Sequence, residues 1–337
     1  MLFSLVSMGG MLAYADQKAI TISNVAQDQV MEEIDFTGGE EGQTGEEVSF
    51  LRFREGEKDT AYLCIPLEKE ITAKDVIMEN HYMERQMWIY IKGSSVDYYK
   101  KEAVSGDISN IEAGTFEALS EFVLLKFSLT DVFEYKSVME ENYLYIEFVP
   151  PREVYDKIVV IDAGCGGDDA GCRINDIVEK DITLDIVKRL KKLLEKTDIK
   201  VYYTRTEDVD YSSESRVALA NAVGADMFIG VRLNTNEDTT VYGTDTLYNE
   251  NYFIPGFGSV ELADMVERNV VTGISGKGNG LYAAEGTDVL IQEAKVPVAV
   301  IRVGYASNKQ EARLLLKEDY RDRIAEGLYQ AILEAFE

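Results

Sequence analysis

The stretch of the chain best suited to chemistry is DAGCGGDDAGCRINDIVE, residues 162–179. Its two thiols, Cys165 and Cys172, and its carboxylates are groups that ligate metals or act as nucleophiles and bases. The β-branched run just before it is typical of a buried parallel strand, and the apolar spacing from Glu179 to Glu195 predicts an amphipathic helix. Because open α/β sheets bind ligands outside the carboxyl ends of their strands, we expect the functional site here.

The histidine content restricts the chemistry of this stretch. The sequence holds one histidine, His81, and it lies far from residues 162–179. A Ser-His-Asp triad, a Cys-His pair or a multi-histidine metal site needs an imidazole close to the reacting atoms. We therefore expect His81 to be an ordinary strand-edge residue, and its position argues against these classes of site.

Length and charge set the broad class of the protein. A chain of 337 residues with 46% hydrophobic residues has room for two domains, each with its own core. The formal net charge of −27 argues against nucleic acid and anionic membrane surfaces as partners, since both attract basic patches. We attribute the charge to solubility outside the cytoplasm, with calcium or a basic partner as the alternative.

Residues 1–15 have the pattern of an export signal. The apolar run Leu2–Leu12 is followed by Ala13-Tyr14-Ala15, the small-x-small ending of a signal-peptidase site. We interpret these residues as a signal-peptide remnant, with an uncleaved anchor as the alternative, so that any membrane tether lies at the N-terminus. The pattern predicts a secreted or cell-surface, wall-associated protein.

Residues 16–150 are predicted to form an all-β domain. Six segments have strand patterns: Ala19–Val25, Val48–Arg54, Thr60–Pro66, Met87–Lys92, Phe122–Ser128 and Tyr143–Val149. No long helical pattern competes with them, which favours a β-sandwich. We expect Trp88, with Met87 and Ile89, to lie in its core. Asp35–Glu47 is predicted to be a glycine-rich acidic loop, and Pro150-Pro151 marks the domain boundary.

Residues 151–337 alternate between strand and helix patterns. The predicted strands are residues 157–162, Ile199–Thr204, Met227–Val231, Gly243–Tyr248, Val289–Gln292 and Val298–Val303. The predicted helices are Glu179–Glu195, Ser213–Val223 with Ser212 as its cap, Ser259–Val270, and two more from Lys309 and Asp319; Gly273–Gly280 is predicted to be a turn. This alternation predicts an α/β fold, a mostly parallel sheet covered by helices on both faces.

Several motifs in this second domain, taken in order, resemble one known family. They are the glycine loop Ile161–Gly167, Glu179-Lys180-Asp181, Thr204-Arg205, Arg216 with Ala220-Asn221, Gly224-Ala225-Asp226, Val231–Asn234, Pro297–Ile301, Gly304-Tyr305 and Ser307-Asn308. From Lys157 to Phe336 the chain is similar to the zinc-dependent N-acetylmuramoyl-L-alanine amidases of cell-wall turnover. The β-rich domain before it is loosely similar to the AMIN-type wall-targeting domains that often precede such amidases.

The resemblance implies a zinc site that this sequence has lost. The family's two histidine ligands fall on Cys165 and Arg232, its ligand glutamate on Glu179, and its general-base glutamate on Arg302. Arginine has no lone pair to donate and stays protonated, so it neither ligates zinc nor acts as a base. A guanidinium ~4 Å from Zn²⁺ is repelled by about 8 kcal/mol at an effective dielectric near 20. We therefore expect no metal cofactor and no catalytic residues, with these four residues forming the former catalytic cleft.

Two features of this cleft are left with alternatives. We expect the arginines to form a salt-bridge cluster with Glu179 in place of the metal, the alternative being drift that leaves them in solvent. Cys165 and Cys172 form either a disulfide or two free thiols. A nucleophilic Cys165, with its pKa lowered by the helix at Glu179 and the arginines, is a further hypothesis.

These observations lead to three functional hypotheses. The first is an inactive amidase homologue that binds peptidoglycan, or a cell-wall hydrolase, through the former substrate cleft. The second is an active N-acetylmuramoyl-L-alanine amidase with a non-standard metal or cysteine site. The third is a scaffold that contacts an active hydrolase through its acidic surface.

Overall fold

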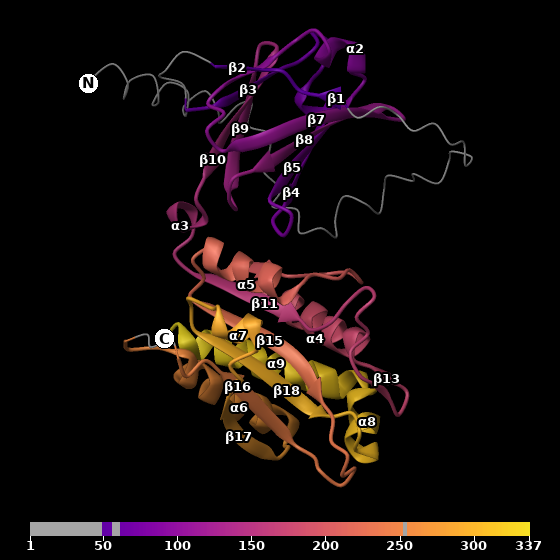
Figure 1. Ribbon diagram of the computed structural model, residues 1–337, viewed down its shortest axis with the longest axis vertical. Helices are drawn as coiled ribbons and strands as arrows, with labels where there is room; N and C mark the ends of the chain where they lie inside the picture. Colours follow the sequence, from indigo (N-terminus) through magenta and orange to yellow (C-terminus); the bar gives the residue numbers. More distant parts are fainter. Residues whose placement is uncertain (1–48, 56–60, 252–254) are drawn as a thin grey trace. The chain divides into compact units, whose positions relative to one another are not determined.

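A computed structural model describes residues 49–55, 61–251 and 255–337 of the chain. The predicted signal segment 1–15, the predicted strand Ala19–Val25 and the predicted loop Asp35–Glu47 lie outside the described residues. The chain divides into two compact units between Val154 and Tyr155 (Figure 1). The short helix α3 (Pro151–Val154) ends the first unit.

In its described residues the first unit holds two five-stranded sheets. One has the order β1 (Ser49–Phe50), β7 (Ile111–Leu119), β8 (Phe122–Leu129), β5 (Gln86–Lys92), β4 (Val76–His81), and the other β2 (Phe53–Glu55), β6 (Val104–Gly106), β3 (Leu63–Pro66), β10 (Tyr143–Val149), β9 (Glu134–Glu140). Neighbouring strands are antiparallel except for β2 and β6. Two short helices, η2 (Ala73–Asp75) and α2 (Val96–Tyr99), join strands. Buried residues of both sheets, such as Ile89 and Ile146, share one core, which makes this unit a β-sandwich.

The tryptophan prediction is wrong because successive strand residues point to opposite faces. Met87 and Ile89 on β5 are fully buried in the core, as expected, but Trp88 between them lies on the outer face and is half-buried. There the Trp88 ring stacks on the ring of His81, with centroids 4.1 Å apart. His81 is the last residue of the edge strand β4, where its Nε2 lies 3.1 Å from Glu79 Oε2.

The second unit is built on one six-stranded sheet. Its strand order is β14 (Lys200–Tyr203), β11 (Ile158–Ala163), β15 (Met227–Asn234), β18 (Val298–Tyr305), β16 (Thr244–Tyr248), β17 (Gly278–Ala283). All neighbouring pairs are parallel except β16 and β18. The predicted mostly parallel sheet is therefore confirmed. The carboxyl ends of β11, β15 and β18 meet at one edge, which is where the glycine-rich stretch begins.

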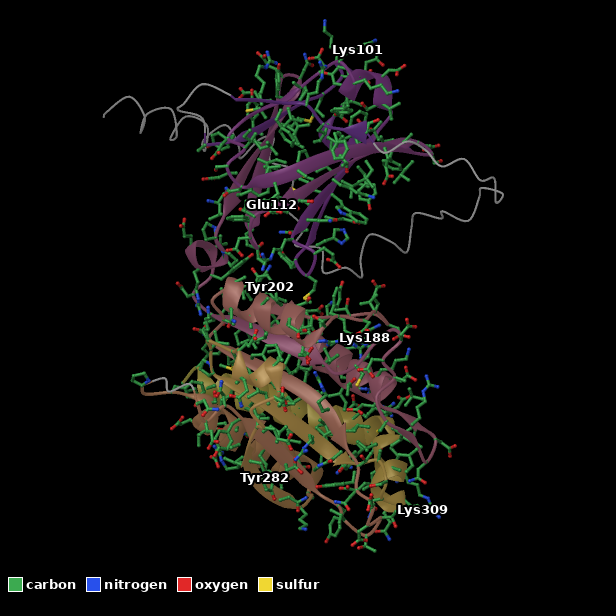
Figure 2. All side chains as sticks on the ribbon, viewed as in Figure 1. Lys101, Glu112, Lys188, Tyr202, Tyr282 and Lys309 are labelled. Carbon is green, nitrogen blue, oxygen red and sulfur yellow. The ribbon has the colours of Figure 1, made fainter. Side chains whose placement is uncertain are left out.

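Helices pack on both faces of this sheet (Figure 1). The main core joins alternate strand residues such as Ile161 to α4 (Glu179–Leu194), α6 (Ser259–Ile274) and α9 (Glu318–Ala335). The strand residues that point the other way, such as Val160, are buried outside that core, on the side of α5 (Ser213–Ala222) and α7 (Val289–Gln292). In α4 one stripe is buried and Lys188 points to solvent (Figure 2). The remaining helix, α8 (Lys309–Leu315), follows β18.

Two local predictions in the second unit are wrong, and one hairpin was not predicted. Val289–Gln292 is the helix α7, and the Asp288 side chain at its start accepts a hydrogen bond from the Ile291 N–H. The strand prediction failed because a run of three apolar residues fits a buried helical turn as well as a strand. The predicted turn Gly273–Gly280 is shorter than expected, because α6 ends at Ile274 and β17 begins at Gly278, which leaves residues 275–277 as the connection. The sequence analysis also missed the hairpin of β12 (Arg173–Ile174) and β13 (Ile177–Val178). The Ser212 cap of α5 is confirmed by its 3.2 Å hydrogen bond from Ser215 N–H.

The helices in the described part of the chain include none with the length and hydrophobicity needed to cross a membrane.

Candidate functional site

The four residues singled out from the sequence lie at the carboxyl ends of β11, β15 and β18. Cys165 follows β11 and Glu179 begins α4, while Arg232 and Arg302 are register partners on the adjacent strands β15 and β18. Cys165 and Glu179 are close to each other, since a Cβ added at Gly171 would lie 2.7 Å from both Cys165 Sγ and Glu179 Cβ. We call this group of four residues, with the carboxylates that pair with its arginines, the cleft.

Arg232 is held by a buried carboxylate. Its Nη2 lies 2.6 Å from Oδ2 of Asp162, whose side chain is fully buried in β11. The other oxygen, Oδ1, accepts hydrogen bonds of 2.6 Å from Arg216 Nη1 and from Thr204 Oγ1. Burial alone would raise the pKa of Asp162, but Arg232 and Arg216 outweigh it and hold the pKa well below its usual range. Burial likewise opposes the charge of Arg232, yet the Asp162 carboxylate raises its pKa overall.

Arg302 is paired with a different buried carboxylate. Its Nε donates to Oδ1 of Asp245, the register partner of Arg302 across the antiparallel β16–β18 pair. Asp245 Oδ2 accepts two further hydrogen bonds, 3.1 Å from Asn234 Nδ2 and 3.2 Å from the Tyr305 hydroxyl. Asp245 is only 1% exposed, so its charge depends on these partners.

The predicted salt-bridge cluster of Glu179 with the arginines is wrong. Glu179 Oε1 accepts a 2.8 Å hydrogen bond from the Leu233 N–H, and Oε2 accepts one of 3.0 Å from the Cys172 N–H. The reason is the direction of the side chains: Leu233 points to the core beneath α4, so its neighbour Arg232 points to the opposite face. The arginines are not free in solvent either, because each pairs with a buried carboxylate and their side chains are only 20% and 28% exposed.

The two cysteines of the glycine-rich stretch are free thiols. Burial, with the Glu179 carboxylate as the second cause, raises the pKa of Cys165 to about 12, even though Arg232 acts in the opposite direction. The same two causes raise the pKa of Cys172 to about 12. Of the two alternatives, the disulfide is therefore absent. The hypothesis of a nucleophilic Cys165 with a lowered pKa is wrong, because burial and a carboxylate outweigh the guanidinium.

The backbone of the glycine-rich stretch is held against the arginines. A Cβ at Gly164 would lie 2.3 Å from Arg232 Cδ, so the arginine stem runs directly across this glycine. Arg205, only 1% exposed, donates to the carbonyl oxygens of Ala163, Gly164 and Lys180 at 2.8–3.0 Å. These contacts tie the loop after β11 to the start of α4 and fix where Cys165 and Glu179 lie.

Sequence reasoning missed Asp162 and Asp245 as partners of the arginines. The available signal was an acidic residue inside or at the end of a run that otherwise reads as a buried strand, because buried carboxylates are rare unless they are paired. Within the described ranges, no three side chains of His, Cys, Asp or Glu come together in a group that could hold a metal ion.

Comparisons with known proteins agree with this fold. A family model described as N-acetylmuramoyl-L-alanine amidase matches residues 159–334. The germination-specific N-acetylmuramoyl-L-alanine amidase of Bacillus subtilis is 30% identical over 196 residues, which cover 53% of this chain and 80% of that protein. The catalytic domain of the amidase CwlV from Bacillus (Paenibacillus) polymyxa has a similar structure, with 27% identity and a TM-score of 0.50 over 53% of this chain and 98% of that one. An N-acetylmuramoyl-L-alanine amidase from Clostridium difficile 630 is 32% identical, with a TM-score of 0.50 over 53% and 96% of the two chains.

Proposed function

The chain belongs to the N-acetylmuramoyl-L-alanine amidase family, and on this premise we propose that it is a catalytically inactive member that binds peptidoglycan through the cleft. The observation that carries the proposal is the pair of arginines on neighbouring strands, each paired with a buried carboxylate. Guanidinium groups and their counter-ions occupy the positions that carry, by resemblance to the family, a metal ligand and the general base. The cleft can thus keep its charges balanced without a metal.

The side chains at these positions do not fit a zinc ion. A catalytic zinc takes three protein ligands, whereas these four positions offer only two candidate donors. They are the Cys165 thiol and the Glu179 carboxylate, and the carboxylate already accepts hydrogen bonds from two backbone N–H groups. Arg232 and Arg302 have no lone pair to donate, and each would repel a divalent cation. We therefore assign no catalytic step through a metal to this chain.

The loss of the general base supports the same proposal. Arg302 stands at the position carried over from the family's general-base glutamate and cannot accept a proton. Loss of general-base catalysis typically lowers a rate by about 10²- to 10⁴-fold. The active-amidase alternative with Cys165 as the nucleophile would need a thiolate, and a thiol with a pKa of about 12 is almost entirely protonated at neutral pH.

The setting of the protein is part of the proposal. A peptidoglycan-binding function requires a location outside the cytoplasm, which agrees with the predicted export signal at residues 1–15 and the AMIN-like wall-targeting role of the β unit. The formal net charge of −27 argues against nucleic acid as a partner. A cell-wall hydrolase is the alternative partner for the same cleft.

The test combines three measurements on the full chain purified with zinc present. We expect substoichiometric zinc by elemental analysis, pelleting with purified sacculi, and no release of stem peptides detectable by mass spectrometry. The double variant Arg232→Glu/Arg302→Glu should pellet less than wild type, and Arg313→Glu on the exposed side of α8 is the matched control. Because reversed charges beside Asp162 and Asp245 can unfold the unit, Arg302→Gln/Asp245→Asn provides a charge-neutral second variant.

Several results would contradict the proposal. One stoichiometric zinc together with stem-peptide release that a chelator abolishes would make the chain an active amidase. Equal pelleting by wild type and by the folded cleft variants would place the wall contact outside the cleft. If the chain captured a cell-wall hydrolase and did not bind sacculi, the partner of the cleft would be a protein and not peptidoglycan.

A further inference from the structure

The two arginines of the cleft differ in which guanidinium nitrogens are available to bind a ligand. Arg232 uses Nη2 for Asp162 and donates from Nη1 to the Val231 carbonyl oxygen at 3.0 Å. Its stem also lies across Gly164, so it is part of the packing of the loop. Both terminal nitrogens of Arg232 therefore already interact with groups of the protein.

Only one nitrogen of the Arg302 guanidinium, Nε, has a hydrogen-bond acceptor among the described residues. Its Nε donates to Asp245, and among residues 49–55, 61–251 and 255–337 no group accepts a hydrogen bond from its Nη1 or Nη2. The side chain is 28% exposed, more than that of Arg232. The Nη1–Nη2 edge of a guanidinium is one of the edges that bind a carboxylate through two parallel hydrogen bonds, and it is the one left when Nε is already used.

Asp245 orients this free edge without competing for it. Its Oδ1 receives the Nε of Arg302, while its Oδ2 is taken by Asn234 and Tyr305. The carboxylate is buried and has these three donors, so it has no need of Nη1 or Nη2. A guanidinium anchored through Nε loses less conformational freedom when a ligand arrives, which favours binding.

We infer that Arg302 is the anion-binding group of the cleft, and that it takes a stem-peptide carboxylate end-on through Nη1 and Nη2. This inference rests on the proposed function and names the chemical group that the cleft recognises. Arg232, by contrast, is a structural counter-ion of Asp162. The position that the family's general base occupies by resemblance has thus become a carboxylate-binding position.

Replacing Arg302 by lysine separates the effect of the paired Nη1 and Nη2 donors from the effect of the positive charge. Arg302→Lys keeps a cation beside Asp245 but removes the planar pair of donors. Loss of one bidentate charged contact is expected to weaken binding by about 10- to 100-fold. Arg313→Lys, the same change on the exposed face of α8, is the matched control and should bind as wild type does. Far-UV circular dichroism shows whether each variant is folded.

The probe is the soluble stem peptide released from sacculi, measured by isothermal titration calorimetry with the full chain. A second sample of the peptide, with its carboxylates converted to amides, tests the ligand side of the contact. We expect wild type to bind the amidated peptide as weakly as Arg302→Lys binds the native one, and Arg302→Lys to show little further loss on amidation. Inorganic phosphate, offered alone, distinguishes a general anion site from a carboxylate site.

Four results would overturn the inference. They are equal affinity of wild type and Arg302→Lys, no effect of amidation, a larger loss in Arg232→Lys than in Arg302→Lys, and tighter binding of phosphate than of the peptide. These outcomes are separate from failure of the proposed function, which appears as stoichiometric zinc and stem-peptide release. An active enzyme can still bind through Arg302, and an inactive wall-binding protein can bind without it.

Discussion

Replacing Asp162 by asparagine tests whether one buried carboxylate compensates the guanidinium groups around it. In the native chain both Asp162 oxygens face cations, Arg216 at 2.6 Å and Arg232 at 2.6 Å, and the side chain has no solvent exposure. Asparagine keeps the shape and one acceptor but removes the negative charge. The buried Arg216 and the partly buried Arg232 are then left without this counter-ion.

The size of the effect at neutral pH follows from the burial. Removing one member of a buried ion pair costs about 3–5 kcal/mol, because the remaining charge is left uncompensated. The amide oxygen of asparagine can still accept from Arg216 or Thr204, so we expect the lower end of that range. Asp162→Asn should therefore lower the free energy of unfolding of the second unit by about 3 kcal/mol at pH 7.

The pH dependence gives the sharper test. The folded pKa of Asp162 lies below the value of about 3.9 expected in the unfolded chain. Its contribution to stability is thus fully present above about pH 4 and is lost as the pH falls toward the folded pKa, at about 1.4 kcal/mol per unit of pKa difference. The difference between wild type and Asp162→Asn should be constant from pH 7 to pH 5 and shrink below pH 4.

Urea unfolding can follow the two units separately. The long helices α4, α6 and α9, of 16, 16 and 18 residues, all belong to the second unit, so circular dichroism at 222 nm reports on it. The single tryptophan of the chain, Trp88, belongs to the β-sandwich, so its fluorescence is an internal control. The reasoning would be refuted if the stability difference between wild type and Asp162→Asn stayed the same from pH 7 to pH 3. It would also be refuted if the transition followed by Trp88 fluorescence shifted as much as the one followed by circular dichroism.

Two other substitutions or treatments test the cleft. Gly164→Ala places a Cβ 2.3 Å from Arg232 Cδ and should destabilise the second unit by about 1–3 kcal/mol in urea unfolding. In the control Gly286→Ala no atom lies within 4 Å of the new Cβ, so its stability should stay within about 0.5 kcal/mol of wild type. Equal effects of the two substitutions would contradict the close approach of Arg232 to Gly164. Because the pKa of Cys165 and of Cys172 is raised to about 12, iodoacetamide at pH 8 should alkylate both about a thousandfold more slowly than in the denatured chain, and the rate should rise with pH up to that value. Peptide mapping by mass spectrometry measures this, and rapid labelling or a peptide that joins the two cysteines would count against it.

Most elements of the second unit could be predicted from the sequence because they depend on local periodicity. The apolar spacing after Glu179 and the cap at Ser212 placed α4 and α5 within one residue of their observed ends. The predictions failed where a segment was too short for its period to be distinctive, as at Val289–Gln292, or where the face of a residue mattered, as at Trp88. Both failures concern what surrounds a residue rather than the residue itself.

The sequence alone determined which groups could be present in the cleft, since an arginine at position 232 or 302 excludes a metal ligand or a base whatever the fold does. Only the tertiary structure decided which carboxylate each arginine meets. Asp162 and Asp245 lie 70 and 57 positions away from Arg232 and Arg302 in the chain, and sheet register brings them to within ion-pair distance. Glu179, the partner expected from the sequence, is drawn instead to backbone N–H groups on the other side of the strand. The physical reason is that the charge of a side chain is a property of its residue, whereas its partner depends on strand register and on which face of the sheet it leaves.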